Sequence, residues 1–243
     1  MDFDDNEYHE KLSLREWGAR MTQGWDRVGT NFSRTRYQYF GAHLPHPLSM
    51  NPANAAFFTA EVWEQIQLWR GPALYERMPL RYKMKGFEFS KSQRAILRRN
   101  SDLTCIIRPC ELTEEKHQLF IDWHKYRFGY PRNIHTWVAS DTSPFRSNEI
   151  SVYDKDKLIA CSFFDTTPSG QYSTIACYDP NERKRSLGTL TLLLEIENTA
   201  FRNKVAHYPG YTFVEESMLD YKKFFHNIEH FDWETQKWQK LSR

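Results

Sequence analysis

Three basic residues, Lys91, Arg94 and Arg98, recur at spacings of three and four along the stretch SKSQRAILRRN (90–100). Residues at these spacings share one face of a helix, so the three cations form a single stripe. A stripe of cations can contact several phosphates of a nucleic acid backbone at once. Solvated helix faces carry the same pattern more often. The stretch therefore predicts either a phosphate-binding surface or a plain exposed face.

The local charge favours phosphate binding. Between Arg77 and Arg108 nine Lys or Arg residues stand against two acids, although the whole chain carries a net charge of only +2. A local field of one sign attracts an anionic partner even when the net charge is near zero. Lys222 and Lys223 add two cations later in the chain. We expect contact with an RNA backbone through charge, without readout of base sequence.

A second candidate for anion binding is the turn RKRSLGTL (183–190), which precedes a predicted helix. GCN5-related N-acyltransferases seat the pyrophosphate of acyl-CoA on a turn of the form R/Q-x-x-G-x-G/A, where backbone N–H groups face the anion. Arg185 and Gly188 match this form. Leu190 occupies the second small position, where its bulk is expected to hinder the phosphates. The turn therefore fits this fold better than it fits the acyl-CoA cofactor.

Several other chemistries lack their residues. The sequence contains no Walker A loop and no G-x-G-x-x-G, G-x-S-x-G or H-E-x-x-H motif. Two histidine pairs, His43 with His46 and His226 with His230, each offer two nitrogen ligands, but no paired cysteines complete a zinc site. We therefore predict no metal.

The cysteines and the hydropathy bear on the compartment. Cys105, Cys110, Cys161 and Cys177 lie in predicted strands, which favours reduced thiols in a cytosolic protein. No apolar run approaches the roughly 20 residues of a membrane span, and the acidic N-terminus lacks the basic region of a signal peptide. The sequence predicts a cytoplasmic protein with no membrane partner.

These residues need elements that position them. From Asp102 onward the patterns predict the order strand, helix, β-hairpin, strand, helix, strand, helix. This order indicates an α/β (α+β) fold, with a GCN5-related N-acyltransferase-like mixed sheet and flanking helices, although other α/β folds share it. A smaller N-terminal domain (1–76) is expected before an acyltransferase-like domain (77–243). The individual predictions are helices at 10–24, 55–71, 90–100, 114–128, 187–203 and 217–227, a loop at 40–54, strands at 79–89, 102–110, 171–180 and 207–213, and a hairpin at 149–165 that turns at 154–157.

Several blocks together resemble one family. PLRYKMKGFEFSKSQRAILRRNSDL (79–103) is similar to a segment of the arginyl- and leucyl-tRNA–protein transferases. YDP (178–180), SLGT (186–189) and GYTFVEESMLDYKKFF (210–225) resemble later elements of that family in the same order, and MTQGWDRVGTNF (21–32) resembles an earlier one. The blocks cover about two thirds of the chain, and their joint occurrence is far more specific than any single one.

The chain departs from the family in two places. Members normally carry cysteine pairs, used for zinc or an iron–sulfur cluster, just before the proline-led strand. Here an insertion without cysteine takes their place, and it falls on the side that recognises the acceptor in the family. The second departure is the missing lysine before the methionine of VEESMLDYKK.

The resemblance implies a reaction. The donor is an aminoacyl-tRNA, which acts as co-substrate so that no cofactor is needed, and the acceptor is an amine of a protein or peptide. The resemblance places Asp179 as the group that orients or deprotonates the amine, with Tyr178 nearby, although an Asp-Pro pair also starts turns. The predicted aminoacyl-tRNA-binding residues are Lys91, Ser92, Gln93, Arg94, Arg98, Arg99, Ser186, Gly188, Thr189, Tyr211, Ser217, Tyr221 and Lys222.

Three questions stay open at this level. Arginine is favoured as the transferred amino acid because Glu215 and Glu216 suggest an acidic pocket, and leucine is the alternative. The acceptor is expected to have an acidic N-terminus, or else to be a dedicated peptide or natural product. An acyl-CoA-dependent N-acyltransferase and a non-catalytic RNA-binding module are the other functions that the residues allow.

Overall fold

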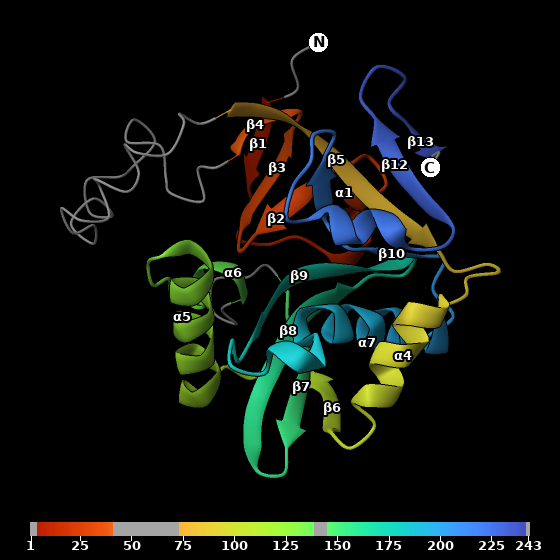
Figure 1. Cartoon of the computed structure of the whole chain (residues 1–243). Helices are drawn as coiled ribbons and strands as arrows, with labels where there is room; N and C mark the ends of the chain where they lie inside the picture. The colour runs from red at the N-terminus through yellow and green to blue at the C-terminus, as the bar shows by residue number, and fades with distance from the viewer. Residues whose placement is uncertain (1–3, 41–72, 139–144, 242–243) are drawn as a thin grey trace.

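Figure 1 shows the protein as a computed structural model, which describes residues 4–40, 73–138 and 145–241. The predicted helix at 55–71, nearly all of the predicted loop at 40–54, and His43 with His46 lie outside the described residues. No helix in the described part of the chain is long and apolar enough to cross a membrane. All four cysteines are free.

A mixed sheet crosses the molecule, with the strand order β13-β12-β5-β10-β9-β8-β7-β6 (Figure 1). Strands β6 to β9 pair antiparallel, whereas β9 and β10 pair parallel and are joined through helix α7. The predicted order is confirmed from residue 102 to the end of the long helix at 187–203, and with it the α/β class and the large mixed sheet with flanking helices. The strands of this sheet are β4 (Tyr37–Phe40), β5 (Ala73–Lys83), β6 (Thr104–Pro109), β7 (Asn148–Asp154), β8 (Lys157–Thr166), β9 (Gly170–Tyr178), β10 (Ala206–Tyr208), β11 (Tyr211–Phe213), β12 (Ile228–Asp232) and β13 (Lys237–Lys240).

Helices α5 (Glu114–Phe128) and α7 (Leu187–Phe201) cover opposite faces of this sheet. Alternate residues of β8 divide between them: Phe163 packs in the core under α5, and Phe164 packs in the core under α7. A strand covered on both faces reads as a continuous apolar run, as β8 does. Helix α5 begins at its predicted cap, Thr113, and ends at Gly129, whose φ is 81°.

The N-terminal part forms a separate three-stranded sheet of β1 (Asp4–Tyr8), β3 (Asn31–Thr35) and β2 (Asp26–Val28). Helix α1 (Leu14–Met21) packs beside it and ends earlier than predicted, before Gly24 takes a φ of 80°. A buried ion pair between Arg27 and Asp165, with N–O distances of 2.6 and 2.7 Å, fixes this part to β8.

Other expectations need correction. The segment predicted as one strand at 207–213 forms β10 and β11, because Pro209 has no N–H to donate and Gly210 adopts a φ of 80°. The last predicted helix is a short 3₁₀ helix, η2 (Asp220–Phe224), and strands β1 to β4 and the hairpin of β12 and β13 were not predicted. The predicted strand at 79–89 begins earlier and ends at Lys83, so the proposed domain boundary at 76/77 falls within β5.

Helix α4 (Lys91–Arg99) is the predicted basic helix. Ser90 caps it through a capping box in which the Gln93 side chain bonds back to the Ser90 N–H. Ile96 and Leu97 are half-buried against residues of α7, so the apolar side of α4 faces the core as its sequence predicts. Two further short helices are α6 (His135–Val138) and the 3₁₀ helix η1 (Arg183–Arg185).

Candidate active site and donor-binding face

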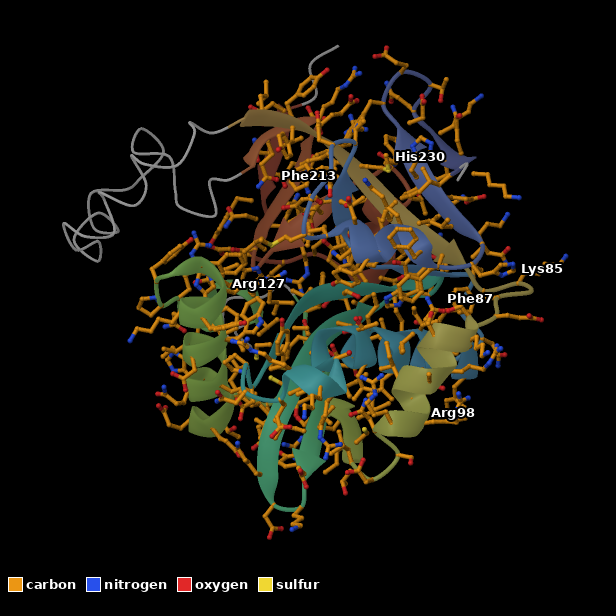
Figure 2. The ribbon with its side chains drawn as sticks, in the orientation of Figure 1. Lys85, Phe87, Arg98, Arg127, Phe213 and His230 are labelled. Carbon is orange, nitrogen blue, oxygen red and sulfur yellow. The ribbon has the colours of Figure 1, made fainter. Side chains whose placement is uncertain are left out.

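The basic stripe on α4 faces outward without acidic partners. Lys91, Arg94 and Arg98 are exposed, and within the described part of the chain none of them forms an ion pair. Figure 2 shows Arg98 on the outer side of α4 and Lys85 on the loop before it. Arg94 makes one local bond to the Phe89 carbonyl. We call the surface formed by Lys91, Arg94 and Arg98 the α4 face.

Neighbouring cations on β5 differ from the α4 face. Arg81 lies 2.6 Å from a Glu229 carboxylate oxygen and over the Trp238 ring, and Lys83 lies 3.4 Å from the same carboxylate group. A carboxylate at this distance neutralises most of the field of the cation. The strand therefore adds less positive charge than its sequence suggests.

The two ends of α4 touch the other predicted segments. Near its start, Gln93 donates to the Phe224 carbonyl of η2 at 3.3 Å. At its end, Arg99 donates to the Lys184 carbonyl, and Asn100 donates to the Arg185 carbonyl at 2.9 Å. Gln93 and Arg99 thus position the helix, and Ser92 is exposed and bonded to Ser90 at 3.0 Å.

The start of α7 is an open helix N-terminus. Ser186 adopts a left-handed conformation (φ 55°, ψ 45°), and its side chain caps no N–H of the helix. Gly188 lies against the Tyr178 ring so closely that a Cβ there would stand 2.9 Å from a ring carbon. The N–H of Thr189 bonds to the Ser186 carbonyl. Leu190 points into the core and is 2% exposed, so the expectation that its bulk would hinder a phosphate at this turn is wrong.

Asp179 forms a turn directly after β9. One carboxylate oxygen accepts bonds from both nitrogens of Asn181 at 2.9 Å, and the other accepts from the Lys157 ammonium at 2.7 Å. Burial raises the pKa of Asp179, but the bonds from Lys157 and Asn181 outweigh it and hold this pKa below its ordinary value. Both oxygens are engaged, which matches the turn-forming alternative for this residue.

Strand β9 loses its partner on one side. It pairs with β10 only from Gly170 to Tyr172, because after the Pro209–Gly210 break the chain continues along β5 as β11 and no longer pairs with β9. The register of β9 against β8 also shifts beside Thr174, as a β-bulge does. Among the described residues no strand pairs with this side of residues 173–178, which we call the open edge of β9.

Helix η2 places Lys222 at the break. The Lys222 ammonium donates to the carbonyls of Pro209 and Tyr211 at 2.8 and 3.2 Å. Burial lowers the pKa of Lys222 to about 8, while the carboxylates of Asp26 and Glu195 oppose that shift. Lys222 thus holds η2 against the Pro209–Gly210 break.

Tyr221 precedes Lys222 in η2, and the Tyr211 carbonyl accepts a bond from the Lys222 ammonium. Although Tyr221 is 39% exposed, desolvation raises the pKa of its hydroxyl to about 12, and the nearby Arg127 opposes this rise. The guanidinium carbon of Arg77 lies 3.8 Å from the centre of the Tyr211 ring. Ser217 bonds to Asp220 and to the Leu219 N–H, so it shapes the start of η2.

A buried polar cluster beside the open edge was missed from the sequence. The Ser173 hydroxyl donates to the Glu195 carboxylate and lies 3.0 Å from Nε2 of His207. Glu195 is 2% exposed and His207 is fully buried. Burial raises the pKa of Glu195 to about 7 and lowers that of His207 to about 3. The available signal was Glu195 itself, a single acid within the apolar run LTLLLEI of α7.

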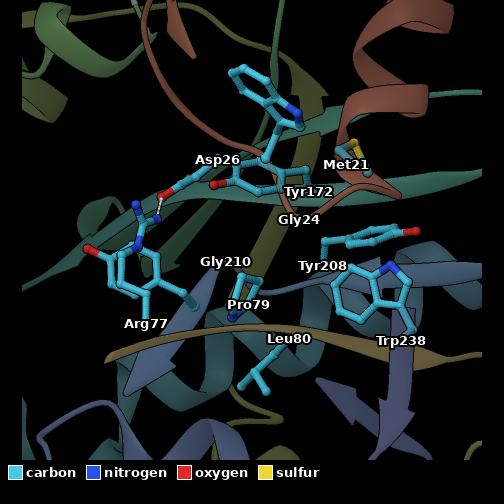
Figure 3. Close-up of a pocket in the computed structure, with 12 residues that line it drawn as sticks. Met21, Gly24, Asp26, Arg77, Pro79, Leu80, Tyr172, Tyr208, Gly210 and Trp238 are labelled. Atoms are coloured by element: carbon cyan, nitrogen blue, oxygen red, sulfur yellow. Dashed lines mark hydrogen bonds and ion pairs between the residues drawn. The ribbon is translucent and has the colours of Figure 1, made fainter. Parts of the chain in front are cut away.

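A pocket opens beside Gly210 of the Pro209–Gly210 break (Figure 3). Its empty volume, including solvent at the mouth, is about 250 Å³. Arg77 and Asp26 form an ion pair of 2.5 Å in its wall, and the Arg77 Nε is buried without a partner. The remaining lining residues are mainly aromatic or small: Met21, Gly24, Trp25, Pro79, Leu80, Tyr172, Tyr208, Gly210, Tyr211 and Trp238.

The structure therefore assembles most of the predicted site residues in two neighbouring places. The α4 face and the start of α7 form one, and Tyr178, Tyr211, Tyr221 and Lys222 around the open edge form the other. Asp179 lies past the end of β9 in its own turn. His226 precedes β12 and His230 lies within it, so they do not share a helix face, and the described residues contain no group of three or more potential metal ligands.

Known proteins are similar to this chain in sequence. Residues 114–232 match the family model described as "Arginine-tRNA-protein transferase, C terminus". An aspartate/glutamate leucyltransferase of Shewanella sp. (strain MR-4) is 30% identical over 161 residues, which are 64% of this chain and 67% of the relative. One from Nitrosococcus oceani is 29% identical over 174 residues, covering 67% of this chain and 70% of the relative. Among solved structures, the C-terminal domain of a putative lysylphosphatidylglycerol synthetase from Agrobacterium fabrum aligns with a TM-score of 0.48 and 11% identity, over 57% of this chain and 47% of that chain.

Proposed function

Because this chain belongs to the family of the arginine-tRNA-protein transferases and aspartate/glutamate leucyltransferases, we propose that it moves an amino acid from tRNA to the N-terminal amine of a protein or peptide. The chain is an aminoacyl-tRNA–protein transferase. Its donor ester is already activated, and the acceptor amine has an ordinary pKa of about 7.7–8.0, so a useful fraction is neutral in a cell. The protein has to position the two and move a proton, and we propose that it needs no cofactor and works in the cytoplasm.

The α4 face carries this proposal. Its three exposed cations have no acidic partner among the described residues, and Arg99 and Asn100 tie α4 to the turn before α7. Cations without partners favour binding of a polyanion. We propose that the α4 face contacts tRNA phosphates, and that the first turn of α7 at Ser186, Gly188 and Thr189 holds the aminoacyl-adenosine end.

The open edge of β9 is the proposed place of the aminoacyl group. It lies between the start of α7, through Tyr178 and Gly188, and the side chains of Tyr221 and Lys222. A strand edge without a partner has free backbone groups that can orient an extended ligand. We propose that Tyr211, Tyr221 and Lys222 line the donor side there.

Leucine is the proposed transferred amino acid, because relatives are named leucyltransferases. Arginine has less support than its sequence argument suggested, since the Glu215 carboxylate accepts a bond from the Glu76 N–H at 3.0 Å. For the acceptor we propose an acidic N-terminal residue, because relatives are named aspartate/glutamate leucyltransferases.

A transfer assay tests the reaction. Total tRNA charged with labelled leucine or labelled arginine is incubated with the protein and with peptides that begin with Asp, Asn or Ala. We expect leucine on the Asp peptide and less on the Asn peptide. Transfer of arginine alone would overturn the leucine assignment, and absence of any transfer would contradict the proposed function.

A binding assay tests the α4 face. Exchanging Arg94 and Arg98 together for alanine removes two expected phosphate contacts. We expect the affinity for tRNA to fall by about tenfold or more, and the slope of log K against log salt to fall by about two. The matched control is the double exchange of Lys237 and Lys240, two exposed cations on β13. Equal effects in both double variants would remove the α4 face from the proposed interface.

A further inference from the structure

We propose that Ser173 and Glu195 form the route by which the attacking amine loses its proton. The inference rests on the proposed function, since the amine is the acceptor of that reaction. Ser173 is the catalytic residue that contacts the amine, and Glu195 acts through it as a positioning residue.

The geometry connects the open edge to a buried acid. Ser173 is the first residue of the open edge, is partly exposed, and donates its hydroxyl to the Glu195 carboxylate. Nε2 of His207 lies 3.0 Å from the same Ser173 oxygen, and its Nδ1 lies 2.9 Å from the Thr199 hydroxyl. Thr199 also bonds to Gln171 at 2.7 Å, which fixes the ring. These hydrogen bonds therefore begin at Ser173, which a ligand can reach, and end at the Glu195 carboxyl, which solvent cannot reach.

Glu195 differs from the other buried carboxylates. Glu149 has the Lys116 ammonium at 2.6 Å, and Asp165 has the Arg27 guanidinium at 2.6 Å. Burying a carboxylate without a cation is costly, and such a group exchanges a proton instead. Glu195 has no Lys or Arg in contact among the described residues; its ion-pair neighbour is His207 at 3.6 Å. It is therefore a buried acid able to change its protonation state.

The surrounding charges leave Glu195 poised near neutral pH. Lys222 and Tyr221 face it from η2, His207 from β10 and Asp165 from β8. Burial is the main reason that its pKa rises to about 7, and it also keeps His207 neutral by lowering the pKa of the imidazole to about 3. An acid with a pKa near the working pH transfers protons efficiently in both directions.

The step balances as follows. The amine nitrogen forms a bond to the ester carbonyl carbon while one of its protons passes to the Ser173 oxygen. The Ser173 proton passes at the same time to ionised Glu195. The bond between the carbonyl carbon and the ribose oxygen then breaks, and the proton returns from Glu195 through Ser173 to that oxygen. The products are an amide and the free hydroxyl of the tRNA, and both side chains recover their starting state.

The test measures transfer from leucyl-tRNA to a peptide with an N-terminal aspartate, as kcat/KM against pH. Below pH 7 the wild-type profile should fall with a slope approaching two, because the acceptor amine and Glu195 both have to lose a proton. We expect Ser173→Ala and Glu195→Gln to lower kcat/KM by about a hundredfold and to reduce that slope to one. Ser151→Ala is the matched control, because Ser151 is a buried serine bonded to the buried Glu149 on β7, and it should change kcat/KM by less than twofold.

Each outcome decides the proposal. Folded Ser173→Ala and Glu195→Gln variants that keep the slope of two would overturn it, as would a Ser173→Ala effect no larger than that of Ser151→Ala. If Glu195→Gln does not fold, Ser173→Ala is compared with Ser173→Thr, which retains a hydroxyl and should recover most of the rate. Failure of the wild-type protein to transfer any amino acid would count against the proposed function instead, so the two failures are distinct.

Discussion

Two carboxylates near strand β9 occupy opposite environments. Asp179 follows the outer end of the strand, where an ammonium and an amide group engage both of its oxygens and keep its pKa low. Glu195 lies behind the inner part of the strand, where a hydroxyl is its closest partner and burial raises its pKa to about 7. Asp179, which belongs to a sequence motif, is held ionised by its turn. Glu195, which lies within an apolar helix, is the acid that can titrate near neutral pH.

The largest expected effect concerns stability at Glu195. Folding raises the pKa of Glu195 from an ordinary 4.5 to about 7, so the folded state binds more protons and loses stability as pH rises through that interval. Glutamine does not ionise. The free energy of unfolding of Glu195→Gln should therefore exceed that of the wild type by about 3 kcal/mol at pH 8.5 and by about 1 kcal/mol at pH 5. Urea unfolding at the two pH values measures the difference.

A mutation that stabilises the protein while slowing transfer would show that the carboxyl is kept for activity rather than for folding. Equal stability changes at pH 5 and pH 8.5 would contradict the comparison, because they would mean that Glu195 does not titrate in this range.

An intermediate effect is expected at Asp179. Its lowered pKa contributes stability that is present above the ordinary value of 3.8 and is lost as pH falls through the folded value, opposite in sign to Glu195. Asp179→Asn keeps an acceptor for the Asn181 N–H but loses the charged bond from Lys157, so it should cost about 1 kcal/mol at pH 7. Thermal unfolding of the two proteins at pH 7 measures this cost.

The same variant sharpens the comparison in catalysis. Because both oxygens of Asp179 are engaged, we expect Asp179→Asn to reduce kcat/KM by less than tenfold. A reduction above a hundredfold, with the acid limb of the pH profile lost, would return the proton-accepting role to Asp179.

The smallest effect is expected at Lys157. Its side chain is 64% exposed, so solvent screens much of its attraction for Asp179. Lys157→Ala should lower stability by a few tenths of a kcal/mol and move the pKa of Asp179 back towards its ordinary value. A loss that persists unchanged in 1 M salt would show that the bond, rather than the charge, carries the interaction.

Local sequence patterns predicted the elements whose caps and periodicity are strong. Thr113 caps α5 as expected, and of the two serines that could cap α4, Ser90 does so. The hairpin of β7 and β8 and the strand β9 also followed from alternation and turn residues. The C-terminal hairpin was missed because β13 is short and mostly exposed, so the apolar alternation that marks a half-buried strand is weak there.

The site was less predictable than the fold. The resemblance to a family named Tyr178, Gly188 and Lys222, and the structure brings them to the same region. Glu195, Ser173 and His207 come together only through the parallel pairing of β9 with β10 and the packing of α7, which are contacts distant in sequence. No spacing rule relates residues 173, 195 and 207, so the buried acid could be recognised only once the sheet order was known.

The Pro209–Gly210 break determines which side chains around the gap beside β9 can be substituted without closing it. The gap beside β9 comes from the backbone, since a proline cannot donate to a neighbouring strand and a left-handed glycine redirects the chain. Exchange of the surrounding side chains therefore leaves the gap open. We therefore expect substitutions around the gap to change which aminoacyl group fits without closing the gap itself.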